Sequence, residues 1–102
     1  GGLLIRPCAS EDELIQEGRE LHHCVAGYAK RHAEGKTAIL FIRQAEAPDK
    51  PFFTLEFDEK EMIVAQNRGL RNCDRTPEVE AFEEAWLEQI RQIKVHGRIR
   101  VA

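Results

Sequence analysis

The chain has 102 residues, which is the size of a single domain with one modest hydrophobic core. Apolar residues make up 42% of it and charged residues 32%, so the composition excludes a disordered or low-complexity protein. No apolar run approaches the roughly 20 residues that a membrane helix needs. Fifteen basic against eighteen acidic residues give a net charge of −3, so the chain has no overall basic charge.

The first half of the chain predicts a short strand and then helix. An apolar run at residues 3–5 fits an edge strand. Ser10 and Glu13 have the spacing of a capping box, which marks a helix start. The apolar face that follows continues at helical spacing to His32. Glycines interrupt this face, so one long helix and two short helices with a break at residues 21–24 fit equally well.

The second half predicts a three-stranded antiparallel meander and a final helix. Residues 38–43, 52–57 and 62–66 are rich in β-branched and aromatic side chains, and the loops between them are short. Thr76 and the proline after it begin an amphipathic helix, whereas the weak alternation of residues 94–102 fits a fourth strand. The sequence therefore predicts one α+β domain, residues 1–102, with N-terminal helices and the C-terminal helix packed on the sheet. Its two opening glycines indicate a domain from within a longer protein.

The hairpin between residues 52–57 and 62–66 decides which polar side chains meet. Thr54 and Glu56 share one face of their strand, as do Gln66 and Arg68 of theirs. An even loop separates the two pairs, whereas an odd loop with a bulge places all four side chains on one surface. We predict the odd loop because it keeps one apolar set together, namely Phe53, Leu55, Phe57, Ile63 and Ala65. Glu56 is then a candidate ion-pair partner of Arg68, or of Arg43 on the neighbouring strand.

The most unusual stretch is EGRELHHCVAGYA, residues 17–29, which places two imidazoles and a thiol side by side. A helix that starts near Cys24 would favour its thiolate through free amides and the positive end of the dipole. In a chemical interpretation Cys24 is a nucleophile or ligand, and His22 or His23 is its base or co-ligand. In a structural interpretation Cys24 fills the core while one histidine caps a helix.

The cysteines indicate the compartment. Cys8, Cys24 and Cys73 are odd in number and widely spaced, with no CxxC pair, which favours a reducing, cytoplasmic location. We predict no cofactor. Zinc at His23 and Cys24 is an alternative, although structural zinc sites usually pair their ligands two to four residues apart.

Five blocks in order carry a resemblance to a known family: LHHCVAGY, EGKTAILFIR, PDKPFFTLE, VAQNRG and TPEVEAF. Together they resemble the PcfJ-like domain family of bacterial conjugative plasmids, phages and other mobile elements, over about residues 6–87. The resemblance implies a longer parent protein and no particular reaction. The positions that match are His23, Cys24, Val25, Tyr28, Thr54, Glu56, Gln66, Arg68, Gly69 and Asn72. This chain departs from the family at Ala26 and at the turn of Glu59 and Lys60, where the family commonly has glycine.

Three functional hypotheses follow. The first is a nucleic-acid-interacting accessory module of a mobile-element protein, which contacts DNA or RNA through basic and amide side chains: Lys30, Arg31, Lys36, Arg43, Arg68, Arg71, Asn72 and Arg75. The net charge and the lack of an exposed aromatic stacking platform oppose it. The second is a protein-interaction or regulatory domain without chemistry. It would bind other proteins, or other domains of the same protein, through acids of the last helix: Glu80, Glu83, Glu84 and Glu88.

The third hypothesis is a Cys/His-dependent enzyme with an unknown substrate. Its candidate catalytic cluster is His23, Cys24, Tyr28, Glu56, Gln66 and Arg68. This hypothesis requires the histidine–cysteine corner to lie against the charged side of the meander, in a recess that solvent can enter. We rank the three hypotheses in the order given. The sequence predicts no membrane partner and leaves the oligomeric state open.

Overall fold

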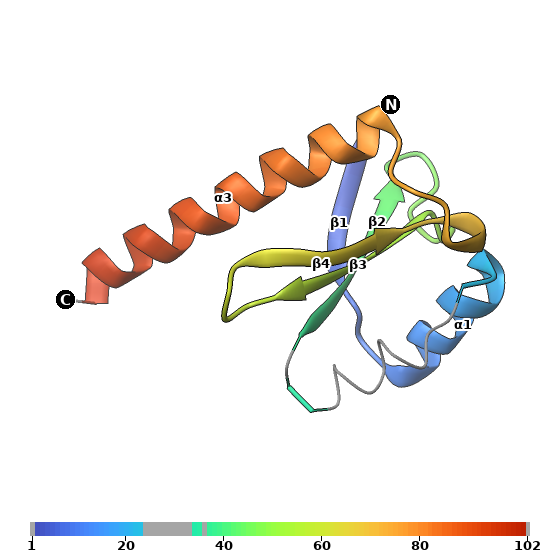
Figure 1. Cartoon of the computed structure of the whole chain (residues 1–102), viewed down its shortest axis with the longest axis horizontal. Helices are drawn as coiled ribbons and strands as arrows, with labels where there is room; N and C mark the ends of the chain where they lie inside the picture. Colours follow the sequence, from blue (N-terminus) through green and yellow to red (C-terminus); the bar gives the residue numbers. More distant parts are fainter. Residues whose placement is uncertain (1, 24–33, 36, 102) are drawn as a thin grey trace.

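The computed structural model describes residues 2–23, 34–35 and 37–101 (Figure 1). Its elements in chain order are β1 (Leu3–Pro7), α1 (Glu11–Leu21), β2 (Ala38–Gln44), β3 (Phe53–Asp58), β4 (Ile63–Arg68), the 3-10 turn η1 (Leu70–Asn72) and α3 (Pro77–Val101). The four strands form one antiparallel sheet in the order β1-β2-β3-β4. The predicted α+β class is confirmed, but the sheet has four strands instead of three.

The additional strand is β1, the apolar run at the start of the chain. It pairs along its whole length with β2, from Leu3 opposite Gln44 to Pro7 opposite Leu40. The run therefore forms the expected edge strand, and proline is tolerated at its end because an edge strand has no second neighbour that needs the missing N–H.

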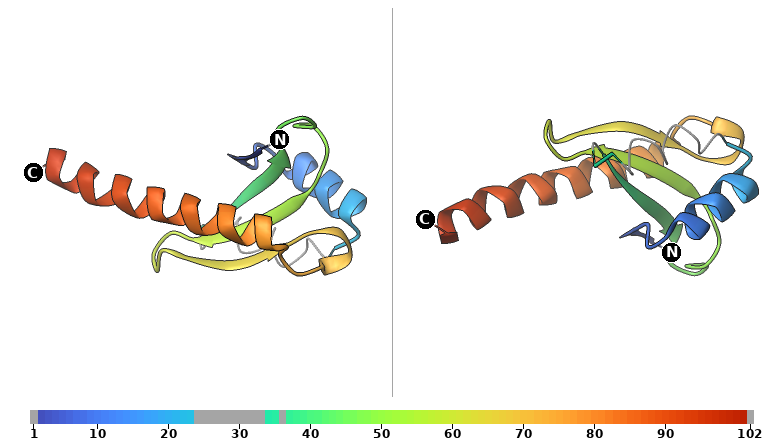
Figure 2. Two further views of the ribbon diagram at one scale, coloured as in Figure 1. Left: turned by 90° about the horizontal axis from the view of Figure 1, so that it is seen from above. Right: turned by 90° about the horizontal axis from the view of Figure 1, so that it is seen from below.

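Helices α1 and α3 cover opposite faces of the sheet (Figure 2). On the face under α3, Val79 packs in one cluster with Ile42, Phe53 and Leu55, and the helix is confirmed as packed on the sheet. The Trp86 ring of this helix meets the Phe57 ring edge-on, with 5.1 Å between centroids. We call this the α3 face.

The opposite face lies under α1 and is called the α1 face. Among the described residues its apolar part is small: Leu14 of α1 packs on Ile39 and Phe41 of β2. The polar side chains of the candidate site lie on this face, because Thr54 is opposite Phe41 and Glu56 is opposite Ile39.

Helix α1 begins and ends close to the predicted positions. Ser10 Oγ accepts a hydrogen bond from the Glu13 N–H at 3.1 Å, and the Glu13 carboxylate accepts one from the Ala9 N–H at 2.8 Å. The helix ends at Leu21, because His22 adopts the left-handed conformation with φ 53°. The rest of the predicted helical face, residues 24–33, lies outside the described residues.

The predicted bulge of the hairpin is confirmed. Thr54 pairs with Arg68 and Glu56 with Gln66, but Phe57 pairs with Val64, so β4 has one additional residue, Ala65. All four polar side chains therefore share one face. Our reason for the prediction was wrong: Val64 and Asn67 lie on the α3 face, whereas Ile63 is 49% exposed and Ala65 is also exposed.

The predicted tail strand at residues 94–102 is wrong, because α3 continues to Val101. Once a helix has formed, each added residue gains a hydrogen bond at little further cost, and the weak alternation of the tail does not outweigh this gain. Within the described residues, no helix has both the length and the apolar character needed to cross a membrane.

Candidate functional site

A chain of polar side chains is buried between α1 and the sheet. Glu17 of α1 accepts two hydrogen bonds from Arg43 of β2, at 2.9 and 2.6 Å. The side chains of Arg43 and Glu17 are 3% and 1% exposed. Thr54 Oγ1 of β3 donates to Glu17 at 2.9 Å, and His23 Nε2 lies 2.9 Å from the same hydroxyl. We call these four side chains the buried network.

The hydrogen bonds of the buried network fix the tautomer of His23. The single hydrogen of the Thr54 hydroxyl points to Glu17, so Nε2 of His23 must carry a proton and donate to Thr54. Burial lowers the pKa of His23, because a charged imidazole loses solvation there. His23 is therefore neutral at pH 7 and is oriented by its neighbours.

The position of Arg43 corrects part of the nucleic-acid hypothesis. Its guanidinium is committed to Glu17 and stacks on the Phe41 ring, 4.7 Å from the centroid. A group that is both buried and paired cannot contact phosphates, so Arg43 does not belong to a nucleic-acid surface. The sequence placed it in that set because its strand position gives no information on the partner 26 residues away.

Glu56 is buried on the same α1 face, but its predicted ion pair is wrong. The Thr37 hydroxyl donates to its carboxylate at 2.8 Å, whereas Arg68 lies 3.5 Å from Asp74 and Arg43 binds Glu17. Each arginine therefore has a different acidic partner, and neither is paired with Glu56.

Sequence analysis predicted that His23 and Cys24 lie against the charged side of the sheet, and the structure shows this contact for His23. His23 reaches that side through Thr54, but Cys24 and Tyr28 lie outside the described residues. His23, Thr54 and Glu56 are buried, whereas Gln66 is exposed. The catalytic cluster as a whole stays a prediction.

Zinc at His23 and Cys24 stays a prediction for the same reason. Among residues 2–23, 34–35 and 37–101, no group of three or more histidine, cysteine or acidic side chains is placed to hold a metal. The Cys8 thiol donates to the Ser10 carbonyl at 3.2 Å, and burial raises its pKa. A thiol in that state is a weak nucleophile.

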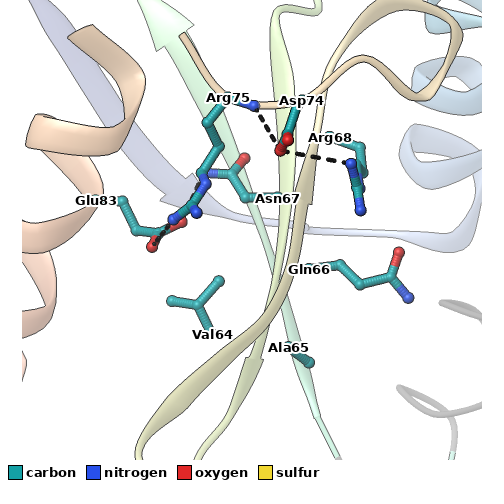
Figure 3. A pocket seen from close by; sticks show the side chains of 8 residues that line it. All are labelled: Val64, Ala65, Gln66, Asn67, Arg68, Asp74, Arg75 and Glu83. Atoms are coloured by element: carbon teal, nitrogen blue, oxygen red, sulfur yellow. Dashed lines mark hydrogen bonds and ion pairs between the residues drawn. The ribbon is translucent and has the colours of Figure 1, made fainter. Parts of the chain in front are cut away.

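A second polar site lies at the open edge of β4 (Figure 3). Residues 68–75, which we call the arginine loop, hold Arg68, Arg71 and Arg75. A cavity of about 140 Å³ lies along β4 and is bounded by Arg68, Asp74, Arg75 and Glu83. Figure 3 shows Gln66 and Arg68 on one side of β4, and Val64 and Asn67 on the other.

Glu83 of α3 forms hydrogen bonds to two residues of this site. It accepts hydrogen bonds from Asn67 Nδ2 at 3.0 Å and from Arg75 Nη1 at 2.8 Å. Its burial contradicts the expectation of an exposed acid. The signal was available, because Glu83 is four residues after Val79 and three before Trp86 and therefore lies on the apolar stripe.

The arginines of this edge differ in how firmly they are held. Arg68 is 42% exposed, and its partner Asp74 is 82% exposed, so water screens that pair strongly. Arg71 is exposed, and no acidic side chain of the described ranges is paired with it. Arg71 and Asn72 both have positive φ, 55° and 61°, a conformation that costs free energy for residues other than glycine.

The remaining predicted basic residues, Lys30, Arg31 and Lys36, lie outside the described residues. Asn72 belongs to η1, where its N–H donates to the Gly69 carbonyl at 3.1 Å. The structure therefore places Arg68 and Arg75 at one cavity, with Arg71 and Asn72 in the exposed turn between them, and removes Arg43 from this set. Sequence reasoning missed Glu17, Asn67 and Glu83 as the residues that support these positions.

Comparison with known proteins identifies the family. The model of the PcfJ-like protein family matches residues 1–83, so the chain belongs to this family. It is also 38% identical over 81 residues to an uncharacterized protein of Listeria innocua, covering 78% of this chain. The chain spans 17% of the length of that relative. No solved structure matches the chain.

Proposed function

We propose that this domain is a nucleic-acid-interacting accessory module of a longer mobile-element protein, and that the arginine loop is its contact surface. One observation carries the proposal: Arg68 and Arg75 line a polar cavity at the sheet edge, and the loop that joins them holds a third arginine, Arg71, which is exposed. The guanidiniums of Arg68 and Arg71 are accessible, and a guanidinium binds a phosphate with two parallel hydrogen bonds.

The weak pairing of Arg68 supports an anionic ligand. Asp74 is mostly exposed and lies 3.5 Å from the guanidinium, so a phosphate can displace it at little cost. Arg75 is held more firmly by buried Glu83 at 2.8 Å. It therefore shapes the cavity wall, while Arg68 and Arg71 supply charge to the ligand.

The same edge is poorly suited to the main alternative, an added peptide strand. A peptide that extends a sheet needs a regular edge strand, and β4 is interrupted by the bulge at Ala65. Bulges and charged side chains are the features by which natural sheets prevent edge pairing. The exposed acids Glu78, Glu80, Glu84 and Glu88 lie on α3, so they repel a nucleic acid from that helix and favour approach at the loop.

The test is binding to labelled single- and double-stranded DNA and RNA, measured by fluorescence anisotropy at about 50 and 200 mM salt. Arg71→Gln should weaken binding several-fold and reduce the slope of log affinity against log salt by about 1. Arg19→Gln is the matched control. Arg19 is exposed on α1, so this substitution removes the same charge from a different part of the surface. Absence of binding at low salt overturns the proposal, as does an equal effect of the two substitutions.

One observation favours a second candidate, the Cys/His-dependent enzyme. The buried network holds His23 neutral and in a defined tautomer, as a general base requires. The rate of Cys24 alkylation against pH tests it: fast labelling below about pH 8.5 supports an activated thiol, and slow labelling that follows an ordinary thiol pKa excludes one.

A further inference from the structure

A larger cavity lies beside the arginine loop and plays no part in the phosphate contacts. It has a volume of about 630 Å³, within the range of about 300–1,000 Å³ typical of small-molecule sites. Leu70 and Cys73 of the arginine loop line it, and Phe52 lines it from the chain that leads into β3. The loop thus contributes to two cavities, of which Arg68 and Arg75 line the smaller.

The walls of this larger cavity suit a flat, largely apolar group with polar edges. Phe52 is half-buried and meets the Phe53 ring edge-on, with 5.0 Å between centroids. Leu70 is 52% exposed, so a large apolar side chain stands at the entrance with one side uncovered. The polar lining residues are Gln44, Lys50 and one acid, Glu20 of α1, and all three can form hydrogen bonds to the edge of a ring.

The position of the cavity indicates where such a group would come from. Leu70 is the immediate neighbour of Arg71, and both belong to η1. A strand whose phosphate lies on Arg71 therefore has its adjoining base within reach of the entrance at Leu70. Sequence analysis found no exposed aromatic side chain on which a base could stack, and the half-buried Phe52 now supplies an aromatic ring for this contact. Phe52 lies just before β3 and lines the cavity, which its apolar sequence neighbours did not indicate.

We propose that this cavity receives one unpaired nucleobase, stacked against Phe52, from the strand whose phosphates lie on the arginine loop. This inference rests on the proposed nucleic-acid function and adds to it a preference for single strands. Stacking on an aromatic side chain tolerates all four bases, because every base has a π-face.

The experiment compares a single-stranded DNA of about 16 nucleotides with the same sugar-phosphate chain lacking its bases. Wild-type protein should bind the complete strand about 5- to 100-fold more tightly than the abasic strand. Phe52→Leu should lose most of this ratio, whereas its affinity for the abasic strand should stay unchanged. Arg71→Gln should weaken binding to both strands by a similar factor.

Two further variants make the result interpretable. Phe82→Leu is the matched control, because Phe82 is a half-buried aromatic residue of α3 that does not line the cavity. Leu70→Ser serves if Phe52→Leu does not fold, because Leu70 is exposed and its loss should lower the same ratio.

The outcomes separate the two proposals. If Phe52→Leu and Leu70→Ser keep the wild-type ratio while Arg71→Gln weakens both strands, the base site is wrong and the nucleic-acid function stands. If wild-type protein binds neither strand at low salt, the nucleic-acid function itself is wrong. If Phe82→Leu lowers the ratio as much as Phe52→Leu, the effect comes from core packing and the base site is also wrong.

Discussion

Glu17→Gln tests whether the buried network holds α1 on the sheet. The substitution keeps the size of the side chain but removes its charge, and it leaves the Arg43 guanidinium buried without a counter-charge. The carboxylate accepts two hydrogen bonds from Arg43 and one from Thr54. Breaking a buried ion pair from one side costs about 3–5 kcal/mol, against a total stability of about 5–15 kcal/mol for a domain of this size. We expect a loss within that 3–5 kcal/mol range.

The chain contains its own control for this prediction. Arg6 and Glu13 form a pair with the same two-bond geometry, at 3.0 and 2.7 Å, but their side chains are 37% and 28% exposed. An exposed pair contributes about 0.2–1 kcal/mol, so Glu13→Gln should cost about 1 kcal/mol. The two substitutions differ mainly in burial.

The assay is urea unfolding followed by far-UV circular dichroism, with the slopes compared to verify two-state behaviour. A double variant, Glu17→Met with Arg43→Met, should be more stable than either single variant, because it leaves no buried charge without a partner. If Glu17→Gln costs no more than Glu13→Gln, the pair is solvated in solution and the buried network does not exist as described.

Three other predictions address single positions. A methyl group at Gly69 would lie 2.9 Å from Phe53 Cζ, so Gly69→Ala should destabilise the domain by about 1–3 kcal/mol through overpacking, and Phe53→Leu should relieve part of this loss in urea unfolding. Burial lowers the pKa of His23, so its contribution to the free energy of unfolding is complete above the unfolded pKa of about 6.5 and falls as the pH drops toward the lower folded value. Urea midpoints measured from about pH 8 to pH 5 should show that His23→Gln removes this part of the pH dependence of stability. Thr76 Oγ1 caps α3 by accepting from the Val79 N–H at 3.2 Å, so Thr76→Ala should lower stability by about 0.5–2 kcal/mol in thermal unfolding, and an unchanged midpoint would show that the cap is unnecessary.

The features that the sequence predicted well are encoded within a few residues. The capping box at Ser10 and the proline after Thr76 mark helix starts through contacts three residues apart. Period-two alternation allows two registers for the hairpin, and the bulged one was chosen because it keeps an apolar set together. Here the correct register was reached with the wrong apolar partners, since Val64 takes the place expected of Ile63 and Ala65.

The features that the sequence could not supply depend on pairings across the fold. The partner of Arg43 is 26 residues earlier and that of Thr54 is 37 residues earlier, so no local pattern reveals that both meet at Glu17. Charged residues were read as surface residues by default, and this failed for Glu17, Arg43 and Glu83, which are buried in pairs.

The charged side chains of the α1 face are buried and tightly paired, whereas those at the edge of β4 are exposed and weakly paired. This difference bears on which of the two can bind an anionic ligand. On the α1 face, the guanidinium of Arg43 forms two hydrogen bonds to a carboxylate that is itself buried, so a ligand at Arg43 would have to replace a strong buried pair. At the edge, Arg68 has a distant and exposed partner, and Arg71 has no ion-pair partner among the described residues. A phosphate at the arginine loop would therefore displace weaker interactions than a ligand at Arg43 would, and this difference supports the proposed contact surface.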